Sequence, residues 1–134
     1  MLNKARLGVE AGMDMVQLYQ LDAGHGRSPV YVEQERYFRD ILEKLDYPVA
    51  ISIHSAVGYL APVNLTAKLC SDYPQIQAIN LHGPSLAYFV NLKDSISSTV
   101  KIYLGIGTVL AGLSMGAWGA QVTEPNQVPR LCQS

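Results

Sequence analysis

The sequence predicts an α/β fold in which parallel strands alternate with helices. Hydrophobic residues make up 49% of the 134 residues and charged residues only 16%, which is typical of a buried parallel sheet. Strand-like apolar runs alternate with helical patterns along the chain, as in βαβ units. A near-repeat supports two equivalent strands, because residues 50–55 (AISIHS) are answered at a constant offset by residues 78–83 (AINLHG).

The first expected elements are a helix, a strand and a second helix. Residues 3–11 carry an apolar stripe and are closed by Gly12 in the position of a C-terminal cap. Residues 14–19 alternate apolar and polar side chains, which indicates a strand. Residues 28–45 begin with Ser-Pro, an N-cap followed by proline at the first helical position, and continue with apolar residues at helical spacing.

The two halves of the near-repeat are expected to form the next strands. Residues 49–54 and 76–82 begin apolar and end on polar side chains, as buried parallel strands with a functional end do. Asn64 is expected to cap a short helix after the first of them, and Ser85 a helix after the second.

The last elements continue the same alternation. Residues 100–104 are β-branched and aromatic like a strand, residues 108–115 form a helix of small residues, and residues 120–123 form a short last strand. A final helix is expected to begin at Glu124. We therefore expect one domain over residues 1–134, with any functional site on the loops that follow the strands.

Composition excludes several classes of partner. The net charge is −1 and no cluster of Lys or Arg occurs, which argues against a nucleic-acid partner and against binding to an anionic membrane. The N-terminus has no apolar targeting segment and no run of about 18 apolar residues occurs, so we expect a soluble, cytoplasmic protein. Cys70 and Cys132 fit neither a disulfide framework nor a metal spacing and are expected to be free, inert thiols.

Five stretches in order along the chain resemble the dihydrodipicolinate synthase and N-acetylneuraminate lyase family of class I aldolase-type lyases. They are EAGMD (10–14), YFRDI (37–41), YPV (47–49), PQIQAI (74–79) and MGAWG (115–119). The resemblance covers nearly the whole chain and implies part of a TIM (β/α)8 barrel, approximately strands four to eight with their helices. On this register the chain is expected to lack the first three strands.

The resemblance also implies where the family's site residues fall. The Schiff-base lysine of the sixth barrel strand aligns with Asn80, and the tyrosine of the fifth with Ser52, whereas the glycine of the seventh-strand turn is retained as Gly105. An amide nitrogen cannot form an imine, because its lone pair is delocalised. The family acts on pyruvate-like keto acids, and we expect this chain to be inactive as a Schiff-base lyase and to use no cofactor.

Residual binding of a small keto or hydroxy acid at the strand ends is the activity that the sequence still supports. The expected substrate-binding residues are Ser52, His54, Asn80, His82 and Gly105. Three lysines are not expected to replace the missing one, because two lie on predicted helices and one lies at the start of a strand, away from the site: Lys68, Lys93 and Lys101.

Two histidines support an alternative chemistry. His54 and His82 end the two repeat strands on matched faces, where neutral imidazoles can bind a divalent metal with Asp22 or Glu124 as a carboxylate ligand. Such a centre would support a metal-dependent hydrolase or lyase. The alternative interpretation is two histidines hydrogen-bonded to local backbone at the rim of the sheet.

Three further interpretations remain. Ser52 as a nucleophile with His54 as base is weak, because residues two apart on a strand lie about 6 to 7 Å apart at Cα with parallel side chains. The glycine-rich turns at 24–26 and 105–107 favour plain turn chemistry over an anion site. A non-catalytic assembly subunit is the third, because five strands cannot close an eight-stranded barrel and the open edges invite a homo-oligomer or a partner chain. Trp118 is expected to be a packing residue.

Overall fold

Helices and strands alternate along the chain. In the computed structural model, residues 2–24 and 26–121 are described. The elements are α1 (Leu2–Glu10), β1 (Val16–Tyr19), α2 (Tyr31–Leu42), β2 (Val49–His54), the short 3-10 helix η1 (Ser55–Val57), α3 (Val63–Asp72), β3 (Ile76–His82), α4 (Leu86–Ser95), β4 (Lys101–Leu104), α5 (Val109–Ser114) and β5 (Gly119–Ala120).

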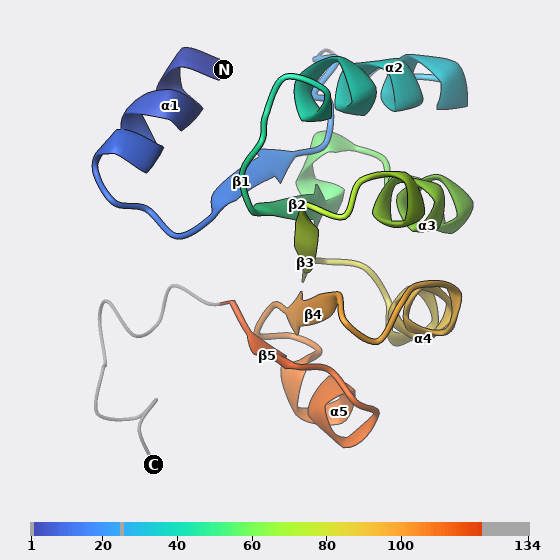
Figure 1. Cartoon of the computed structure of the whole chain (residues 1–134). Coiled ribbons are helices and arrows are strands. Elements are labelled where there is room, and N and C mark those ends of the chain that lie inside the picture. Colours follow the sequence, from blue (N-terminus) through green and yellow to red (C-terminus); the bar gives the residue numbers. More distant parts are fainter. Residues whose placement is uncertain (1, 25, 122–134) are drawn as a thin grey trace.

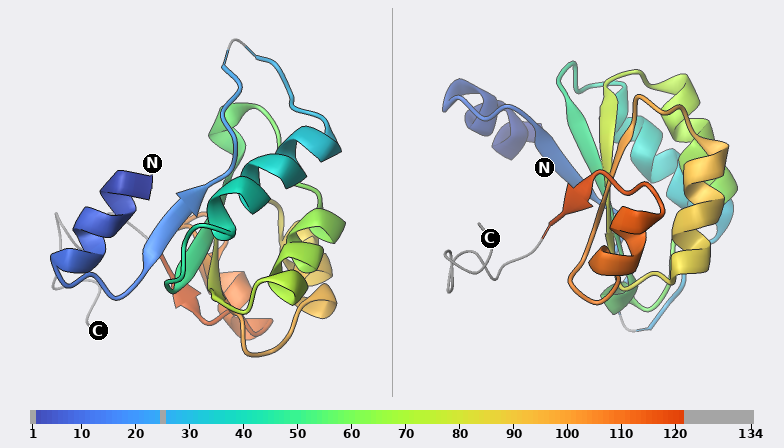
Figure 2. Two further views of the ribbon diagram at one scale, coloured as in Figure 1. Left: turned by 45° about the horizontal axis from the view of Figure 1, so that its top comes forward. Right: turned by 90° about the horizontal axis from the view of Figure 1, so that it is seen from below.

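The strands form one parallel sheet whose order follows the chain, β1-β2-β3-β4-β5. Figures 1 and 2 show the sheet as a curve, with α2, α3 and α4 in a layer outside it. β1 and β5 are the two ends of this sheet, and each pairs with a single strand. The predicted α/β class with parallel strands is therefore confirmed, and the inner face of the curve is left open.

Two helix starts differ from the prediction. α2 begins at Tyr31, so Val30 occupies the N-cap position in place of Ser28, and Val30 N donates to Glu33 Oε2 at 3.0 Å. α3 begins one residue before Asn64, whose Oδ1 accepts from Leu65 N at 2.9 Å. In both cases a nearby side-chain oxygen binds a backbone N–H group without occupying the N-cap position.

Other element ends agree with the prediction or fall outside the described residues. Ser85 caps α4, and its Oγ accepts from Tyr88 N at 3.3 Å. The last strand, β5, consists of Gly119 and Ala120, earlier in the sequence than expected. Residues 122–123 of that expected strand and the helix expected from Glu124 lie outside the described residues.

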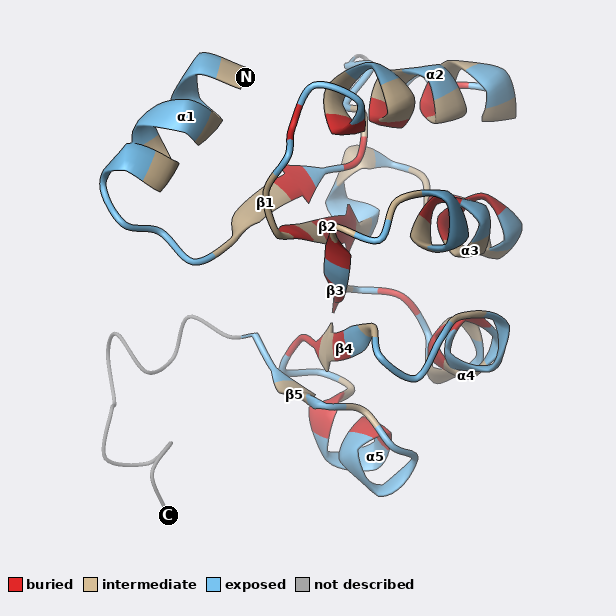
Figure 3. Ribbon diagram, viewed as in Figure 1, coloured by how far each residue is buried: buried red, intermediate tan, exposed pale blue. Residues whose placement is uncertain are grey.

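The hydrophobic core lies between the outer face of the sheet and the helices. Alternate strand residues such as Ile51, Ile53, Ile79 and Leu81 point outward. The helices α2, α3 and α4 each pack one apolar stripe against these residues. The buried residues of the three stripes are Phe38, Leu42, Leu65, Leu69, Phe89 and Leu92. Figure 3 shows the buried residues along the sides of α2, α3 and α4 that face the strands. This packing fixes the strands, so the polar strand residues between the apolar ones face the inner side of the curve.

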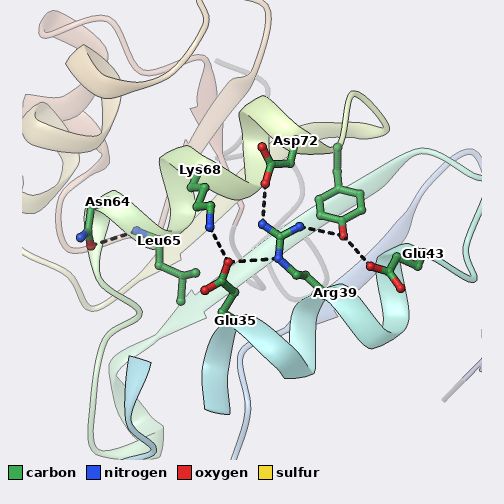
Figure 4. Close-up of polar contacts among 8 residues, drawn as sticks. Glu35, Arg39, Glu43, Asn64, Leu65, Lys68 and Asp72 are labelled. Carbon is green, nitrogen blue, oxygen red and sulfur yellow. Dashed lines mark hydrogen bonds and ion pairs between the residues drawn. The ribbon is translucent and has the colours of Figure 1, made fainter. Parts of the chain in front are cut away.

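A polar cluster joins α2 to α3 on the outside of the molecule (Figure 4). Glu35 Oε1 lies 2.7 Å from Lys68 Nζ and 3.1 Å from Arg39 Nε, and Arg39 Nη2 lies 2.5 Å from Asp72 Oδ2. The Arg39 guanidinium also lies against the ring of Tyr73. The Lys68 and Arg39 side chains lower the pKa of the Glu35 carboxyl. The cluster therefore holds the two helices in register.

Cys70 lies on α3 as a free thiol, and burial raises its pKa to about 12. That value matches the predicted inert thiol, whereas Cys132 lies outside the described residues. Among the helices of the described residues, none combines the length and the apolar character that a membrane span needs.

Candidate functional site

Polar strand residues form rows across the inner face of the sheet. Tyr19, Ser52, Asn80 and Tyr103 are consecutive Cα partners on β1, β2, β3 and β4. Neighbours in register on parallel strands point to the same face, so these four side chains form one layer of the curve. The row is polar at its centre and aromatic at both ends.

Ser52 and Asn80 form the buried centre of this row. Ser52 is fully buried and Asn80 is 2% exposed. Asn80 Nδ2 donates to Ser52 Oγ at 3.4 Å, and Asn80 Oδ1 has no hydrogen-bond partner among the described residues. If the amide is turned over, the serine hydroxyl can donate to the oxygen, and the nitrogen is then left over. Either orientation leaves one amide atom of Asn80 for a further partner.

His54 and His82 lie one layer higher, at the carboxyl ends of β2 and β3. They are Cα partners, and their rings are stacked with centroids 5.1 Å apart and planes 4° from parallel. His54 Nδ1 accepts from Ala56 N at 3.3 Å and so caps η1. This contact is the backbone hydrogen bond that the alternative interpretation of the histidines expected for His54. Ser52 instead bonds to Asn80, so the structure does not join Ser52 to His54 as nucleophile and base.

Gly105 follows β4 and lies against the His82 ring. Its N–H donates to Leu81 O at 2.9 Å. A Cβ atom at this position would lie 3.1 Å from His82 Nδ1, closer than side chains normally approach. The expected site residues Ser52, His54, Asn80, His82 and Gly105 are therefore brought together at one end of the sheet, and we call them the rim residues.

A hollow of about 570 Å³ lies on the inner face and reaches Asn80. The hollow exists because the next layer of the inner face, toward the amino ends of the strands from the Ser52–Asn80 row, has small side chains. Ala50 and Ala78 are Cα partners in this layer, and both line the hollow. Tyr103 and Gln17 also line the hollow. Its volume is within the range typical of small-molecule sites.

Sequence reasoning missed Gln20, which holds the rim in place. This buried amide follows β1 and donates from Nε2 to His54 O at 2.8 Å and to Tyr59 O at 3.0 Å. Ala61 N donates back to Gln20 Oε1 at 3.4 Å. A polar residue directly after a strand was the available signal, but its partners lie about forty residues away along the chain.

Tyr59 is a second missed residue beside the rim. Its hydroxyl donates to Leu21 O, on the loop that follows β1. Burial, with smaller contributions from Tyr37 and Asp22, raises its pKa to about 12. The phenol therefore stays protonated at neutral pH and acts as a hydrogen-bond donor that ties two loops together.

The metal alternative finds little support in the part of the chain that the structure describes. Asp22 Oδ1 accepts from Gly24 N at 2.9 Å in a local turn. Within residues 2–24 and 26–121, no group of three or more His, Cys, Asp or Glu side chains is placed to hold a metal ion. Glu124, the other expected carboxylate, lies outside the described residues.

Two of the three lysines considered as substitutes are held away from the inner face. Lys68 pairs with Glu35, and Lys93 Nζ donates to Met115 O at 3.0 Å. Lys101 begins β4 beside Ala78 and lines the hollow, and its Nζ lies 4.5 Å from the centre of the Trp118 ring. Trp118 is 63% exposed, and its ring packs against this lysine at the surface.

The curated proteins with similar sequences are all described as DapA-like lyases. DapA-like lyases of Pyrobaculum neutrophilum and Pyrobaculum aerophilum are 24% identical over 110 residues, which is 77% of this chain and 36% of theirs. One from Pyrobaculum arsenaticum is 24% identical over 124 residues, 85% of this chain and 41% of its own. The chain thus spans well under half the length of these relatives. No family model matches the sequence.

Solved structures share the fold over almost the whole chain. The 4-hydroxy-tetrahydrodipicolinate synthase of Methylacidiphilum fumariolicum superposes with a TM-score of 0.85 at 22% identity, over 96% of this chain and 43% of that one. A dihydrodipicolinate synthase of Bacillus anthracis gives 0.84 at 20% identity, over 98% and 44%. A prophage protein of the same family from E. coli, solved with pyruvate, gives 0.84 at 17%, over 97% and 44%. The chain therefore resembles the dihydrodipicolinate synthase family over part of its length, in sequence and in its partial-barrel fold.

Proposed function

We propose that the inner face of this chain binds a small keto or hydroxy acid without forming a Schiff base. The observation that carries the proposal is Asn80, a buried amide on the row where the family resemblance places the catalytic lysine. An amide can hydrogen-bond to a carbonyl or hydroxyl group but cannot add to it. The activity proposed is therefore recognition of the acid, without the covalent step.

Hydrogen bonding at Asn80 supports this proposal. A buried polar atom without a partner is costly, typically by about 1–3 kcal/mol, and a ligand that supplies the missing partner recovers that cost. The amide atom left over by the Ser52 contact is such a group, and its side chain lines the hollow. A hydroxyl of a hydroxy acid can donate to Oδ1, and a keto oxygen can accept from Nδ2 when the amide is turned over.

The imidazoles at the rim supply groups for the carboxylate of the same acid. His54 and His82 are half-buried at the carboxyl ends of β2 and β3, one layer above Asn80. Ring N–H groups donate hydrogen bonds to carboxylates, more strongly when the ring is protonated. A small acid with its carboxylate at the rim and its keto or hydroxyl oxygen at Asn80 would use both layers.

The test is a titration of the 15N-labelled chain with pyruvate and with lactate, followed through the side-chain amide signals of Asn80. The proposal predicts saturable shifts of these signals in the unsubstituted chain. For the variants, calorimetry with the same acids gives the affinity, which should be at least about 10-fold lower in Asn80→Leu because one buried hydrogen bond is lost. Asn91→Leu removes an exposed amide from α4 and is the matched control. Shifts that do not saturate, or equal affinity in the two variants, would contradict the proposal.

A second candidate function is that of a subunit in an assembly. It rests on the sheet of the described residues, in which the end strands β1 and β5 each pair with one strand only. Free parallel edges pair readily with other strands, and a barrel removes them by closure. Sedimentation velocity tests this candidate: it predicts a species larger than one chain, and a strictly monomeric species at all concentrations would count against it.

A further inference from the structure

A second hollow of about 320 Å³ lies at the other end of the sheet from the rim. It is formed where α4 ends and β4 begins, and Lys93, Ser97, Ser98, Lys101 and Trp118 are among the residues that line it. The rim residues lie at the carboxyl ends of the strands, so this hollow is away from the rim, although Lys101 lines both this hollow and the hollow of the inner face. Among the described residues, its lining contains two lysines and no Asp or Glu, whereas the hollow of the inner face has Lys101 as its one lysine.

Neither lysine of this hollow is neutralised by an acidic side chain in the described part of the chain. Lys93 Nζ donates to the carbonyl oxygen of Met115, and Lys101 Nζ lies over the ring of Trp118. Both partners are uncharged groups that orient an ammonium and leave its charge in place. Lys68 differs, because Glu35 neutralises it. Two ammonium groups on one hollow therefore create a positive potential there.

The chemistry of the lining selects the ligand. Ammonium groups bind phosphate as point charges, and two of them suit a dianion. Ser98 lies at the same wall and its hydroxyl can donate a further hydrogen bond, whereas the Ser97 hydroxyl lies 2.9 Å from Thr99 Oγ1 and accepts from Thr99 N. Trp118 is 63% exposed and adds a flat apolar surface, against which the organic part of a phosphate ester can lie. We propose that this hollow binds phosphate, either free or as a monoester, between Lys93 and Lys101.

Intrinsic fluorescence gives a direct test, because Trp118 is the only tryptophan of the chain. The full chain is titrated with inorganic phosphate and with phenyl phosphate, and sodium chloride keeps the ionic strength constant. We expect a saturable change in tryptophan emission with both probes. Tighter binding of phenyl phosphate would assign the site to phosphate esters, and equal affinity would assign it to the phosphate group alone.

Variants that each remove one lysine charge distinguish a specific phosphate site from non-specific electrostatic attraction of phosphate to the protein. Lys93→Met and Lys101→Met should each weaken phosphate binding at least about 10-fold, as loss of a charge-assisted hydrogen bond does. Lys44→Met removes the same charge near the end of α2, outside the hollow, and should change the affinity less than about 2-fold. Because Lys101→Met also alters the surroundings of the ring, affinities are compared by calorimetry as well as by emission.

The titrations of the variants either support the phosphate site or overturn it. Saturable binding that is weakened in both hollow variants and retained in Lys44→Met supports the site, provided that circular dichroism shows all variants folded. An emission change that follows ionic strength alone, equal affinity in Lys93→Met and Lys44→Met, or the absence of saturable binding would overturn it. Asn80→Leu should leave phosphate binding unchanged, so this outcome is independent of the acid site at the rim.

Discussion

Asn80 and Ser52 are Cα partners on neighbouring parallel strands, and Asn80 Nδ2 donates to Ser52 Oγ at 3.4 Å. This contact satisfies one end of a buried amide, and Asn80 Oδ1 has no partner in the described part of the chain. The pair therefore combines a structural hydrogen bond with one buried amide atom that has no partner, on a side chain that lines the hollow.

Coupling between Ser52 and Asn80 is predicted to be small and favourable. Ser52→Ala removes the acceptor of the amide N–H and should lower the free energy of unfolding by about 1 kcal/mol. In a double-mutant cycle with Asn80→Leu, the two changes should be non-additive by about 0.5–1 kcal/mol, because the second removes the group that the first leaves unpaired. Urea denaturation of the four proteins measures this energy, and strict additivity would show that the contact contributes nothing.

Gln20 is predicted to hold the rim through its three backbone contacts. Gln20→Ala should lower the free energy of unfolding by about 1–3 kcal/mol, because the carbonyls of His54 and Tyr59 lose a buried donor. Hydrogen exchange should accelerate at Ala61, whose N–H donates to Gln20. Gln77→Ala truncates an exposed amide on β3 and should cost less than about 0.5 kcal/mol. Equal losses in the two variants would refute this role for Gln20.

Because of the Glu35 cluster, the free energy of unfolding is predicted to decrease at acid pH. Lys68 and Arg39 lower the pKa of Glu35 in the folded chain, so the stabilisation that this carboxyl supplies is complete above its unfolded pKa, about 4.3. It is lost as the pH falls through the lower, folded value. The difference in unfolding free energy between wild type and Glu35→Gln should therefore shrink from about pH 5 to about pH 3. Urea denaturation at each pH measures it.

The control for this prediction is Glu10→Gln, a carboxyl at the end of α1 and outside the cluster. Its difference from wild type should stay nearly flat over the same range. Salt should reduce the Glu35 effect, because the carboxyl lies at the surface, where ion pairs are screened. A Glu35 difference independent of both pH and salt would show that the cluster acts by packing alone.

Cys70 is predicted to be unreactive in the folded chain. Its pKa of about 12 leaves very little thiolate at pH 8, and thiolate is the reactive form. Alkylation by iodoacetamide should be at least about 100-fold slower in the native chain than in urea. Peptide mass spectrometry separates Cys70 from Cys132. Comparable rates in both states would mean that the α3 thiol is accessible.

The pairing of the rim residues could be predicted from the sequence because it depends on a local pattern. Two strands with the same order of apolar and polar residues, joined by one helix, lie in register when they are parallel neighbours. The Cα pairs Ser52 with Asn80 and His54 with His82 confirm this. The family resemblance is confirmed by the curated relatives and by the structural neighbours.

Other features could not be predicted, because they depend on positions set by the tertiary fold. Gln20 finds its partners on a loop about forty residues away, and Tyr103 joins the Ser52–Asn80 row only through the register of β3 with β4. A packing role was expected for Trp118, but its partner was not: its ring lies against the Lys101 ammonium and is 63% exposed. Single polar residues carry no signal for such contacts until the strands are placed.

The most direct test of the central claim is borohydride reduction of the full chain in the presence of pyruvate, read by intact-protein and peptide mass spectrometry. Reduction traps any imine between a lysine and the keto acid as a stable adduct. With Asn80 in place of a lysine, we predict an unmodified chain, and we predict an adduct in Asn80→Lys, where burial favours the neutral amine. A pyruvate adduct on any lysine of the wild-type chain, whether Lys68, Lys93, Lys101 or another, would contradict the account.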